Sequence, residues 1–547
     1  MTNGSADARY DTIVIGSGAS GLTCALRLAQ TGQRVLVAEK NDWIGGLSHG
    51  FSQDGFYWDH GGHIFLAYRL GGQAREVFQR LKLDERIEMN PDRHDYTCNF
   101  PDDSIYMPAD ITEASDGFSE RFPEEREGTE RLMLLMETLL EEAFMFVPAL
   151  RVHGPNGERR RIDPILEQFT RRSLGRFGGT MAGATGSPGA TLLRYQFSTY
   201  TELIDEHIKN PRLKAYFSMF SAGIGSGPGE LSAVVAALFM ISALNQMWMP
   251  RGGFSKIAET LAAMIEEEGG TIATGAEVGR VLVENGRASG IETLDGRRFT
   301  ADSIVSATDA RRLFLDLLPP SAVPAEMRER LPKLDLTRAW FQVFLGLDMD
   351  LAPLQKEKKV GRFNFIYPTD DLDRAMAQLP EGNVDDASFM LYVATLHQPE
   401  MAPEGKQSIK LEASSTFRPQ GLEWERDKER IADALAKSAE SVIPGLRENV
   451  IARLIRTPVD MQRDTYNTDA AYCGWGWTPK MLTRERPQPR SPVKGLYLTG
   501  HWTTPTAGVP WVMLSGYNTA GMVLRDRNGR RNGRVAVGRR AKAGAKR

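Results

Sequence analysis

Residues 10–40 read YDTIVIGSGASGLTCALRLAQTGQRVLVAEK, and this stretch decides the fold. Residues 12–15 form a short β-branched apolar run, which is typical of a strand buried on both faces. Gly16, Gly18 and Gly21 follow directly, as G-x-G-x-x-G at a predicted strand-to-helix transition. In this context the glycines permit a tight turn, a close approach of a diphosphate to backbone N–H groups, and packing of the helix on the strand.

The residues that follow continue the pattern of a dinucleotide-binding unit. Apolar residues recur at helical spacing over 22–29, Gly32 provides a C-terminal stop, and residues 34–38 predict the next strand. Glu39 ends that strand, where a carboxylate can accept hydrogen bonds from the ribose hydroxyls of an adenine dinucleotide. An anion at this position repels a 2′-phosphate, so Glu39 argues against NADP, but it leaves NAD and FAD open.

Length and composition describe a soluble globular enzyme with more than one core. The chain has 547 residues, of which 41% are hydrophobic and 25% are charged. This length exceeds one compact core, so we expect two domains or one domain with a large insertion. The three cysteines are scattered and odd in number, which argues against a disulfide framework or a zinc site. His60 and His63 lack further ligands nearby in the sequence, so we expect no metal.

Two segments bear on localisation. The first nine residues are polar and lack the apolar core of a signal peptide, so we expect residues 1–9 to be disordered and the protein to be cytoplasmic. The longest largely apolar run, residues 231–244, is too short to span a bilayer. We expect a buried helix there, with a pocket wall or a helix in a membrane surface as the alternatives.

Residues 525–547 concentrate positive charge. They contain ten Lys or Arg and one acid, a formal charge of +9, and the net charge of −3 therefore leaves −12 for the rest of the chain. The segment has no apolar periodicity, so we predict a disordered tail. Basic tails bind anionic lipid or nucleic acid, and a solvated tail without a function is the remaining alternative.

Helix and strand patterns divide the rest of the chain. Residues 110–249 are predicted to be mostly helical, and the Gly-rich residues 175–190 predict a mobile loop over a pocket. Residues 249–310 return to the rhythm of a dinucleotide domain, with hairpin turns at residues 285–286 and 295–296. Three further strands should form a separate sheet: AWFQVFLGL, SFMLYVATL and SIKLEASSTF.

The order of these motifs resembles the phytoene desaturase and carotenoid isomerase family of FAD flavoproteins. The matching elements are the glycine turn, Glu39, Gly45-Gly46, RGGFSKIAETLAAMIEEEGG, DSIVSATDA, LHQPEMAPEGK and GLYLTGHWTTPTAGVPWVMLSGYNTAG. The resemblance implies an amine-oxidase-like α/β fold, with a discontinuous Rossmann-like FAD-binding domain and an inserted substrate domain of helices plus a mostly antiparallel sheet. The implied FAD-binding segments are 10–109, 245–320 and 488–524. The substrate and membrane-associating domain would be 110–244 and 321–487.

The resemblance also implies which residues would contact FAD. The ADP half would lie against Gly16, Gly18, Ala19, Ser20, Gly21, Glu39 and Lys40, with Val278 contacting adenine. The pyrophosphate and ribityl chain would lie against Gly45, Gly46, Leu47 and Gly500. The isoalloxazine would lie against Gly508, Val509 and Pro510, with Val512 and Met513 at its pyrimidine edge. The positive N-terminus of the last helix would stabilise negative charge on the reduced ring.

Two departures from the family pattern bear on the substrate. Leu47 stands where many desaturases have Arg or Ser, and Trp502 and Trp511 stand where smaller residues are common and would narrow the pocket over the flavin. His501 is the titratable group nearest the predicted flavin, either as a general base or as a turn-stabilising residue. We take His501, Trp502 and Trp511 as the candidate catalytic residues. The aromatic residues of 472–477 are either a wall for a flat substrate or core packing.

The resemblance implies an FAD-dependent oxidoreductase of the desaturase, isomerase or saturase type, with hydride transfer to or from flavin N5. The expected substrate is a hydrophobic polyene or isoprenoid. The alternatives are an amine oxidase on the same fold and a non-catalytic prenyl-lipid-binding escort protein. A hydrophobic substrate favours lipid as the partner of the basic tail, so we expect peripheral contact with an anionic membrane, on its inner face, and no nucleic acid.

Overall fold

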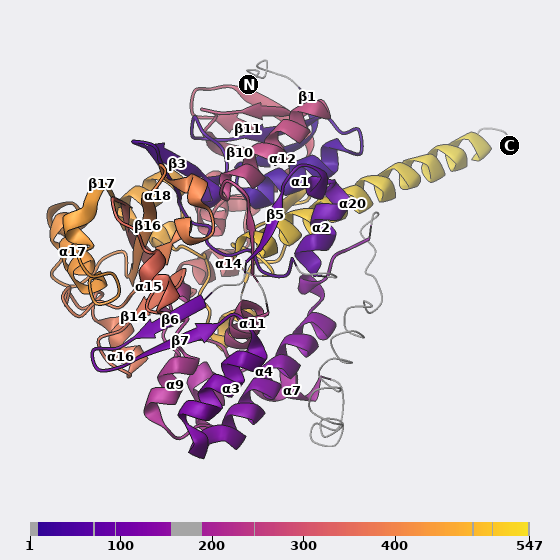
Figure 1. Cartoon of the computed structure of the whole chain (residues 1–547). Coiled ribbons are helices and arrows are strands. Elements are labelled where there is room, and N and C mark those ends of the chain that lie inside the picture. The colour runs from indigo at the N-terminus through magenta and orange to yellow at the C-terminus, as the bar shows by residue number, and fades with distance from the viewer. Residues whose placement is uncertain are drawn as a thin grey trace.

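A seven-stranded sheet, parallel around its first strand, carries the glycine turn (Figure 1). In the computed structural model, which describes residues 9–68, 72–92, 95–154, 189–245, 247–483, 486–505 and 507–544, its order is β10-β11-β12-β1-β2-β9, with β18 on β12. The strands are β1 (Arg9–Ile15), β2 (Val35–Ala38), β9 (Thr271–Ala273), β10 (Val278–Glu284), β11 (Arg287–Thr293), β12 (Arg298–Ser306) and β18 (Leu496–Leu498). Three distant parts of the sequence form this sheet, which confirms the discontinuous Rossmann-like arrangement.

The glycine turn joins β1 to α1 (Ala19–Ala29), whose residues are all buried. A Cβ at position 21 would lie 2.2 Å from the carbonyl oxygen of Gly16, so only glycine allows the helix to cross the turn this closely. α1 packs on α12 (Ser255–Glu267) and α20 (Val509–Gly544). The predicted hairpin turns at residues 285–286 and 295–296 are confirmed, since they join the antiparallel strands β10, β11 and β12.

A second seven-stranded sheet has the order β17-β13-β16-β15-β14-β6-β7 and is antiparallel except for β14 with β6. Its strands are β6 (Asp95–Asn99), β7 (Ser104–Pro108), β13 (Ala339–Leu347), β14 (Phe363–Ile366), β15 (Phe389–Val393), β16 (Gln407–Ser415) and β17 (Val450–Arg456). One face packs against α17 (Trp424–Ala439), seen at the left of Figure 1. The three strands that the sequence predicted for a separate sheet are β13, β15 and β16.

The predicted domain boundary at residue 109 is wrong. β6 and β7 lie before it, and β6 pairs with β14 of the second sheet rather than with any strand of the first. The physical reason is that a strand pattern shows burial and alternation but not the partner strand, which is chosen by long-range backbone pairing. The preceding strand, β5 (Met89–Asp92), belongs to neither of the seven-stranded sheets, so the second of them begins at β6.

Helices form the lower layer in Figure 1. They are α3 (Ile111–Arg121), α4 (Arg126–Phe146), α7 (Ala190–Tyr195), α8 (Tyr200–Asp205), α9 (Pro211–Phe217), α10 (Ser221–Ile224) and α11 (Ala233–Leu244). α11 contains the long apolar run and packs on α4 as a largely buried helix, and its Val234, Val235 and Leu238 also line a cavity. The first two of the options set out above therefore both apply. Within the described part of the chain, no helix combines the length and the apolar character needed to cross a bilayer.

Smaller elements complete the fold. They are β3 (Gly50–Gln53), β4 (Phe56–Asp59), α2 (Gln73–Leu81), β8 (Met247–Pro250), α13 (Ala310–Arg312), α14 (Ala325–Arg330), α15 (Ala352–Lys356), α16 (Leu372–Ala377), α18 (Pro458–Thr465) and α19 (Pro479–Thr483). β3 pairs with β4, and β5 pairs with β8. Residues 1–8 and nearly all of the predicted Gly-rich loop lie outside the described residues.

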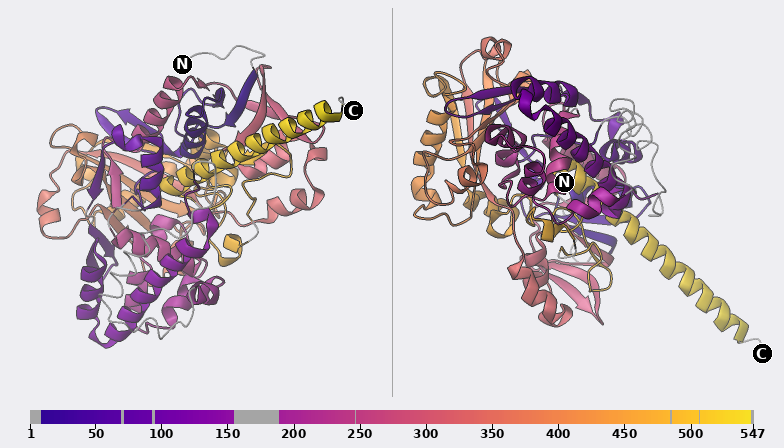
Figure 2. Two further views of the ribbon diagram at one scale, coloured as in Figure 1. Left: turned by 90° about the vertical axis from the view of Figure 1, so that its right-hand side faces the viewer. Right: turned by 90° about the horizontal axis from the view of Figure 1, so that it is seen from below.

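The prediction of a disordered tail is wrong for residues 525–544. α20 continues through them to Gly544 and leaves the body of the molecule as a single helix (Figures 1 and 2). The absence of an apolar face does not exclude a helix. Arg, Lys and Ala are good helix formers, and they extend a helix already nucleated by the buried residues before them. Asp526 anchors the departing helix through Arg490 and the hydroxyl of Tyr497.

Candidate functional site

A cleft opens at the carboxyl ends of the parallel neighbouring strands β1 and β2. This is the edge at which sheets of this type bind their ligands. Its walls come from segments as far apart as residues 15 and 512. Of the residues predicted from the sequence, those lining the cleft are Gly16, Gly18, Ala19, Ser20, Glu39, Lys40, Gly45, Gly46, Leu47, Val278, Gly500, His501, Gly508, Val509 and Val512. The structure therefore brings most of the predicted contact residues together, and their individual roles toward FAD stay predictions.

The helical geometry of α20 explains three predicted residues that do not line the cleft. Gly508, Val509 and Val512 share one face because residues three and four apart lie together on a helix. Pro510, Trp511 and Met513 fall on other faces, and Trp511 and Met513 join the apolar core. Gly21 is also absent from the wall, because its role is the close crossing of α1 over the turn.

The first turn of α1 is suited to an anion. Gly18 caps the helix without a side-chain hydrogen bond, and the first turn carries no acidic residue. The N–H groups at this end therefore point outward unsatisfied by capping side chains, and the helix dipole favours negative charge there. Gly46 lies over the turn, where a Cβ would be 3.3 Å from the Cα of Gly18. These features fit a diphosphate held between the two glycine segments.

Glu39 is buried and links the glycine turn to the end of β2. Its Oε2 accepts hydrogen bonds from the backbone N–H of Ser17 at 2.9 Å and from the Ser17 hydroxyl at 2.6 Å. Its Oε1 accepts from the N–H of Asn41 at 2.9 Å. The carboxylate thus positions the turn as well as lining the cleft, a second role that its sequence position does not reveal.

Residues from α18 and the segment after it cover the cleft near Glu39. Lys40 Nζ donates to the Asn41 side chain and to the carbonyl of Arg463, both at 2.8 Å, and lies 4.3 Å from the ring centre of Tyr466. Arg312 stacks on the same ring at 4.0 Å. Burial lowers the pKa of Lys40, while nearby carboxylates oppose that shift. Sequence analysis missed these covering residues, since α18 belongs to the segment assigned to the other domain.

At the opposite end, Gly61, Tyr472, Cys473 and Ala507 join His501 in the wall. The Tyr472 hydroxyl donates to the carbonyl of Gly61. Burial, with a smaller contribution from Arg486, lowers the pKa of His501 to about 4. His501 is therefore neutral and a weak base at neutral pH, which favours the structural alternative over general-base catalysis.

The prediction that Trp502 and Trp511 narrow the pocket is not supported by their positions. Trp502 packs edge-on against Trp475 at 4.9 Å, and its Nε1 donates to the Asn467 side chain at 2.9 Å. Trp511 lies in the apolar core 5.8 Å from Phe144. Neither indole is itself in the wall of the cleft; Trp502 lies behind Asn467, which is, and Trp511 lies behind Gly508. Their assignment as catalytic residues stays a prediction.

The aromatic segment 472–477 divides between the two roles proposed for it. Tyr472 lines the cleft, whereas Trp475 is buried behind it and Trp477 packs against Phe239 at 5.9 Å.

Across the described ranges, no three His, Cys, Asp or Glu side chains are grouped to hold a metal ion.

Comparisons with known proteins bear directly on this cleft. Residues 19–524 match the family described as flavin containing amine oxidoreductase. A phytoene desaturase (lycopene-forming) of Pseudescherichia vulneris is 24% identical over 94% of this chain and 99% of its own length. Prolycopene isomerase 1 of an Oncidium hybrid cultivar is 26% identical over 94% of this chain and 84% of its own length. The structure of putrescine oxidase bound to putrescine superposes with a TM-score of 0.62 at 13% identity, over 95% of this chain and 99% of that one.

Proposed function

Because the chain belongs to the flavin-containing amine oxidoreductase family and is an FAD-dependent oxidoreductase, we propose that its substrate is a hydrophobic polyene or isoprenoid. The reaction is a desaturation, isomerisation or saturation with hydride transfer to or from flavin N5. The carotenoid-related names of its relatives support this substrate class. The putrescine oxidase structure supports the fold alone at its low identity.

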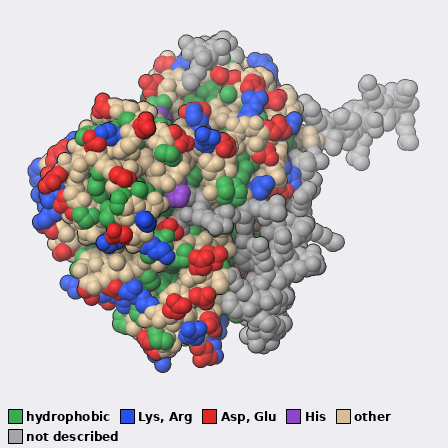
Figure 3. All heavy atoms as spheres, viewed as in Figure 1, with side chains coloured by type: hydrophobic (Ala, Val, Ile, Leu, Met, Phe, Trp, Pro, Cys, Tyr) green, Lys and Arg blue, Asp and Glu red, His purple; other side chains and the backbone are tan. Residues whose placement is uncertain are grey.

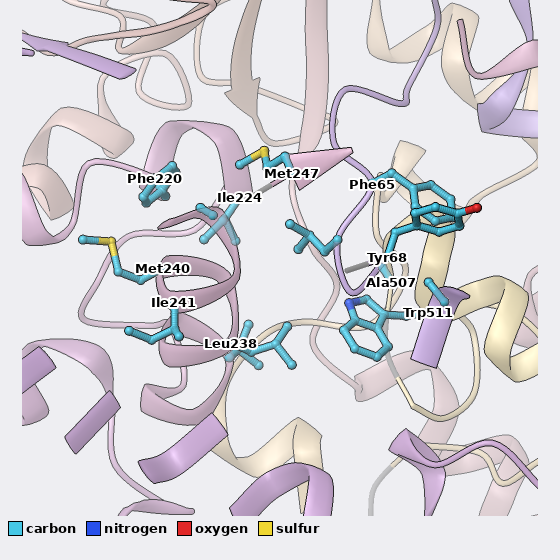
Figure 4. Packing of buried hydrophobic residues seen from close by; sticks show 14 of the residues in the cluster. Phe65, Tyr68, Phe220, Ile224, Leu238, Met240, Ile241, Met247, Ala507 and Trp511 are labelled. Atoms are coloured by element: carbon cyan, nitrogen blue, oxygen red, sulfur yellow. The ribbon is translucent and has the colours of Figure 1, made fainter. Parts of the chain in front are cut away.

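The observation that carries the proposal is the apolar surrounding of the cleft, since one apolar core adjoins both the cleft and the helical layer. Ala507 lines the cleft and belongs to the same apolar cluster as Leu238, Met240 and Ile241 of α11 (Figure 4). Phe65 and Tyr68 belong to this cluster from the other side. Leu238, with Val234 and Val235 of the same helix, also lines a second cavity. An extended hydrocarbon is compatible with apolar walls of this kind, because its burial needs no hydrogen-bond partners.

The chain's own residues supply position and electrostatics to the cofactor. Bound FAD supplies the hydride chemistry. The N-terminus of α1 fits the diphosphate, and Glu39 fits a ribose hydroxyl. Val509 and Val512 lie in the first turn of α20 and line the cleft, and this turn carries no acidic residue. The positive N-terminal end of the helix therefore favours negative charge on the reduced ring.

The test is anaerobic bleaching of the bound flavin by a panel of carotenoid precursors, retinoids, fatty acids and amines, each with detergent or liposomes. We expect polyenes or isoprenoids to bleach the flavin. Full-rate bleaching by a water-soluble amine without a lipid phase would instead identify an amine oxidase. A purified protein without flavin absorption would indicate the escort alternative.

We also propose that the protein contacts anionic membranes peripherally through the part of α20 that leaves the body of the molecule. The support is electrostatic: residues 525–547 carry +9 while the rest carries −12. On the face in Figure 3, acidic and basic side chains are interspersed without a broad basic surface. A projecting basic helix is attracted to anionic headgroups by about 1 kcal/mol per Lys or Arg near the surface.

A further inference from the structure

A second cavity lies among α4, α11, α19 and α20, next to the cofactor cleft. Its volume is about 390 Å³, within the range of ligand pockets of roughly 300–1,000 Å³. No described residue lines both the cavity and the cleft. The cavity is therefore a separate compartment rather than an extension of the FAD site.

Apolar side chains converge on this cavity without being fully covered by the protein. Val147, Val234, Leu482 and Met522 are only partly buried, and all of them line the cavity. They come from separate parts of the fold, namely the end of α4, α11, α19 and α20. Apolar surface that several elements leave uncovered at one place is typical of a binding site, whereas apolar residues exposed singly need no such explanation.

The wall is poorly suited to an ionic ligand. Among the described lining residues there is no Asp, Glu, Lys or Arg, and His153 is the one ionisable side chain. The polar side chains of α20 already bind backbone groups. Asn518 accepts from the N–H of His153 at 2.9 Å and donates to the carbonyl of Arg151 at 2.8 Å, and Thr519 donates to the carbonyl of Leu498 at 3.1 Å. A buried ammonium, carboxylate or phosphate would lack a charged partner here, whereas a hydrocarbon needs none.

Ser515 connects the cavity wall to the wall of the cofactor cleft. Ser515 lines the cavity, and its Oγ accepts a hydrogen bond of 3.1 Å from the N–H of Gly500, which lines the cleft. The same Oγ donates to the carbonyl of Thr504 at 3.0 Å, in the cavity wall. Val512, about one helical turn before Ser515, lines the cleft. A ligand in the cavity would therefore lie against the back of the segment that borders the flavin site.

The surroundings of the cavity favour delivery of a ligand from a membrane. Phe146, the last residue of α4, is 44% exposed, and Leu193 and Phe197, in and just after α7, are 68% and 66% exposed. α7 packs on α4. In the opposite wall, Met522 stands three residues before the basic segment 525–547, on the helix that leaves the body of the molecule (Figure 2). Exposed apolar side chains and nearby positive charge together attract a protein to an anionic lipid surface.

We propose that this cavity binds one uncharged hydrocarbon chain, at a site separate from the cofactor cleft. The acyl chain of a membrane lipid and an isoprenoid share this chemistry, since both are apolar along their length. A phospholipid would insert an acyl chain and keep its headgroup outside, beside the basic part of α20. An isoprenoid would enter by its apolar end.

The test maps photo-crosslinks on the FAD-loaded protein with two probes that carry a diazirine near the apolar end of the chain. One probe is a palmitoyl phosphatidylglycerol in vesicles, and the other is geranylgeraniol in detergent. We expect crosslinks within residues 143–153, 234–238 and 515–522. Crosslinks there from the phospholipid alone would identify an acyl chain as the ligand, and crosslinks from the isoprenoid alone would identify an isoprenoid. Crosslinks from neither probe in these three segments would overturn the inference.

Val234→Trp fills the cavity from α11, and Met522→Trp fills it from α20 if the first variant does not fold. An indole that excludes about two methylenes of the chain should lower the affinity roughly 15-fold, since each methylene contributes roughly fourfold. Ile451→Trp is the matched control, because Ile451 is 53% exposed on β17 of the second sheet, and it should crosslink as the wild type does.

Undiminished crosslinking in a folded Val234→Trp or Met522→Trp protein that retains its flavin absorption would contradict the assigned site. Because this readout needs no turnover, it is decided even where the proposed function fails.

Discussion

Replacing Glu39 by glutamine should weaken FAD binding through the glycine turn. The carboxylate accepts three hydrogen bonds with its two oxygens, two from Ser17 and one from Asn41. Glutamine has one acceptor oxygen, so keeping the Ser17 bonds turns its NH₂ group toward the N–H of Asn41. One bond to a charged group is then lost, at a cost of about 1.5–3 kcal/mol. The turn can hydrate when FAD is absent, so most of this cost falls on the bound form, which corresponds to an affinity about 10- to 150-fold lower.

The assay is a titration of the apoprotein with FAD, followed by quenching of flavin fluorescence. Glu292→Gln is the matched control, since Glu292 lies on the edge hairpin of the same sheet and pairs with Arg280 and Arg298 at the surface. It should bind FAD as the wild type does. An affinity of Glu39→Gln within about twofold of the wild type, or about 0.4 kcal/mol, would refute the role assigned to the carboxylate.

Three further perturbations test other parts of the structure. Gly21→Ala places a Cβ 2.2 Å from the Gly16 carbonyl, so α1 must shift and the purified protein should lose its flavin absorption; retention of stoichiometric FAD would contradict the close crossing. Removing residues 530–547 should weaken sedimentation of the protein with anionic vesicles while FAD stays bound. Unchanged sedimentation would indicate that the tail does not bind membranes. Burial raises the pKa of Asp59 to about 6 from 3.8, so the folded state takes up a proton and the free energy of unfolding falls as pH rises through that window, by at most about 3 kcal/mol. Asp59→Asn should remove this component in denaturant titrations from pH 4 to 7, and identical pH slopes for the two proteins would show that Asp59 is not the group responsible.

Local sequence signals predicted the elements that form before any tertiary contact is needed. The β-branched run, glycine turn and helix of residues 10–40 appear as β1 and α1, and the two hairpin turns join β10, β11 and β12. These signals work because strand alternation, helix periodicity and the left-handed backbone of glycine depend on near neighbours. The ordered motifs, taken with the family resemblance, also predicted most of the cleft wall.

Other features depended on contacts between distant residues. In the sequence, Trp502 and Trp511 are neighbours of residues that line the cleft. In the structure, Trp502 lies on a face of its turn that packs against Trp475, and Trp511 lies on a face of α20 that packs in the apolar core. The extension of α20 past residue 525 was missed because an absent apolar face was taken as absent structure, although helix propensity sustains a helix that has already been nucleated.

The sequence by itself determined that a dinucleotide unit opens the chain and which segments return to complete it. Only the tertiary structure decided that β6 and β7 join the second sheet and that His63, Gln342 and Glu412 meet inside the molecule. In the sequence, Lys410 and Glu412 look like ordinary strand residues. The alternation shows that they share one face of the strand, but it does not show what packs against that face. The physical reason is that strand pairing and burial of charge are settled by the packing of segments hundreds of residues apart, which no local pattern records.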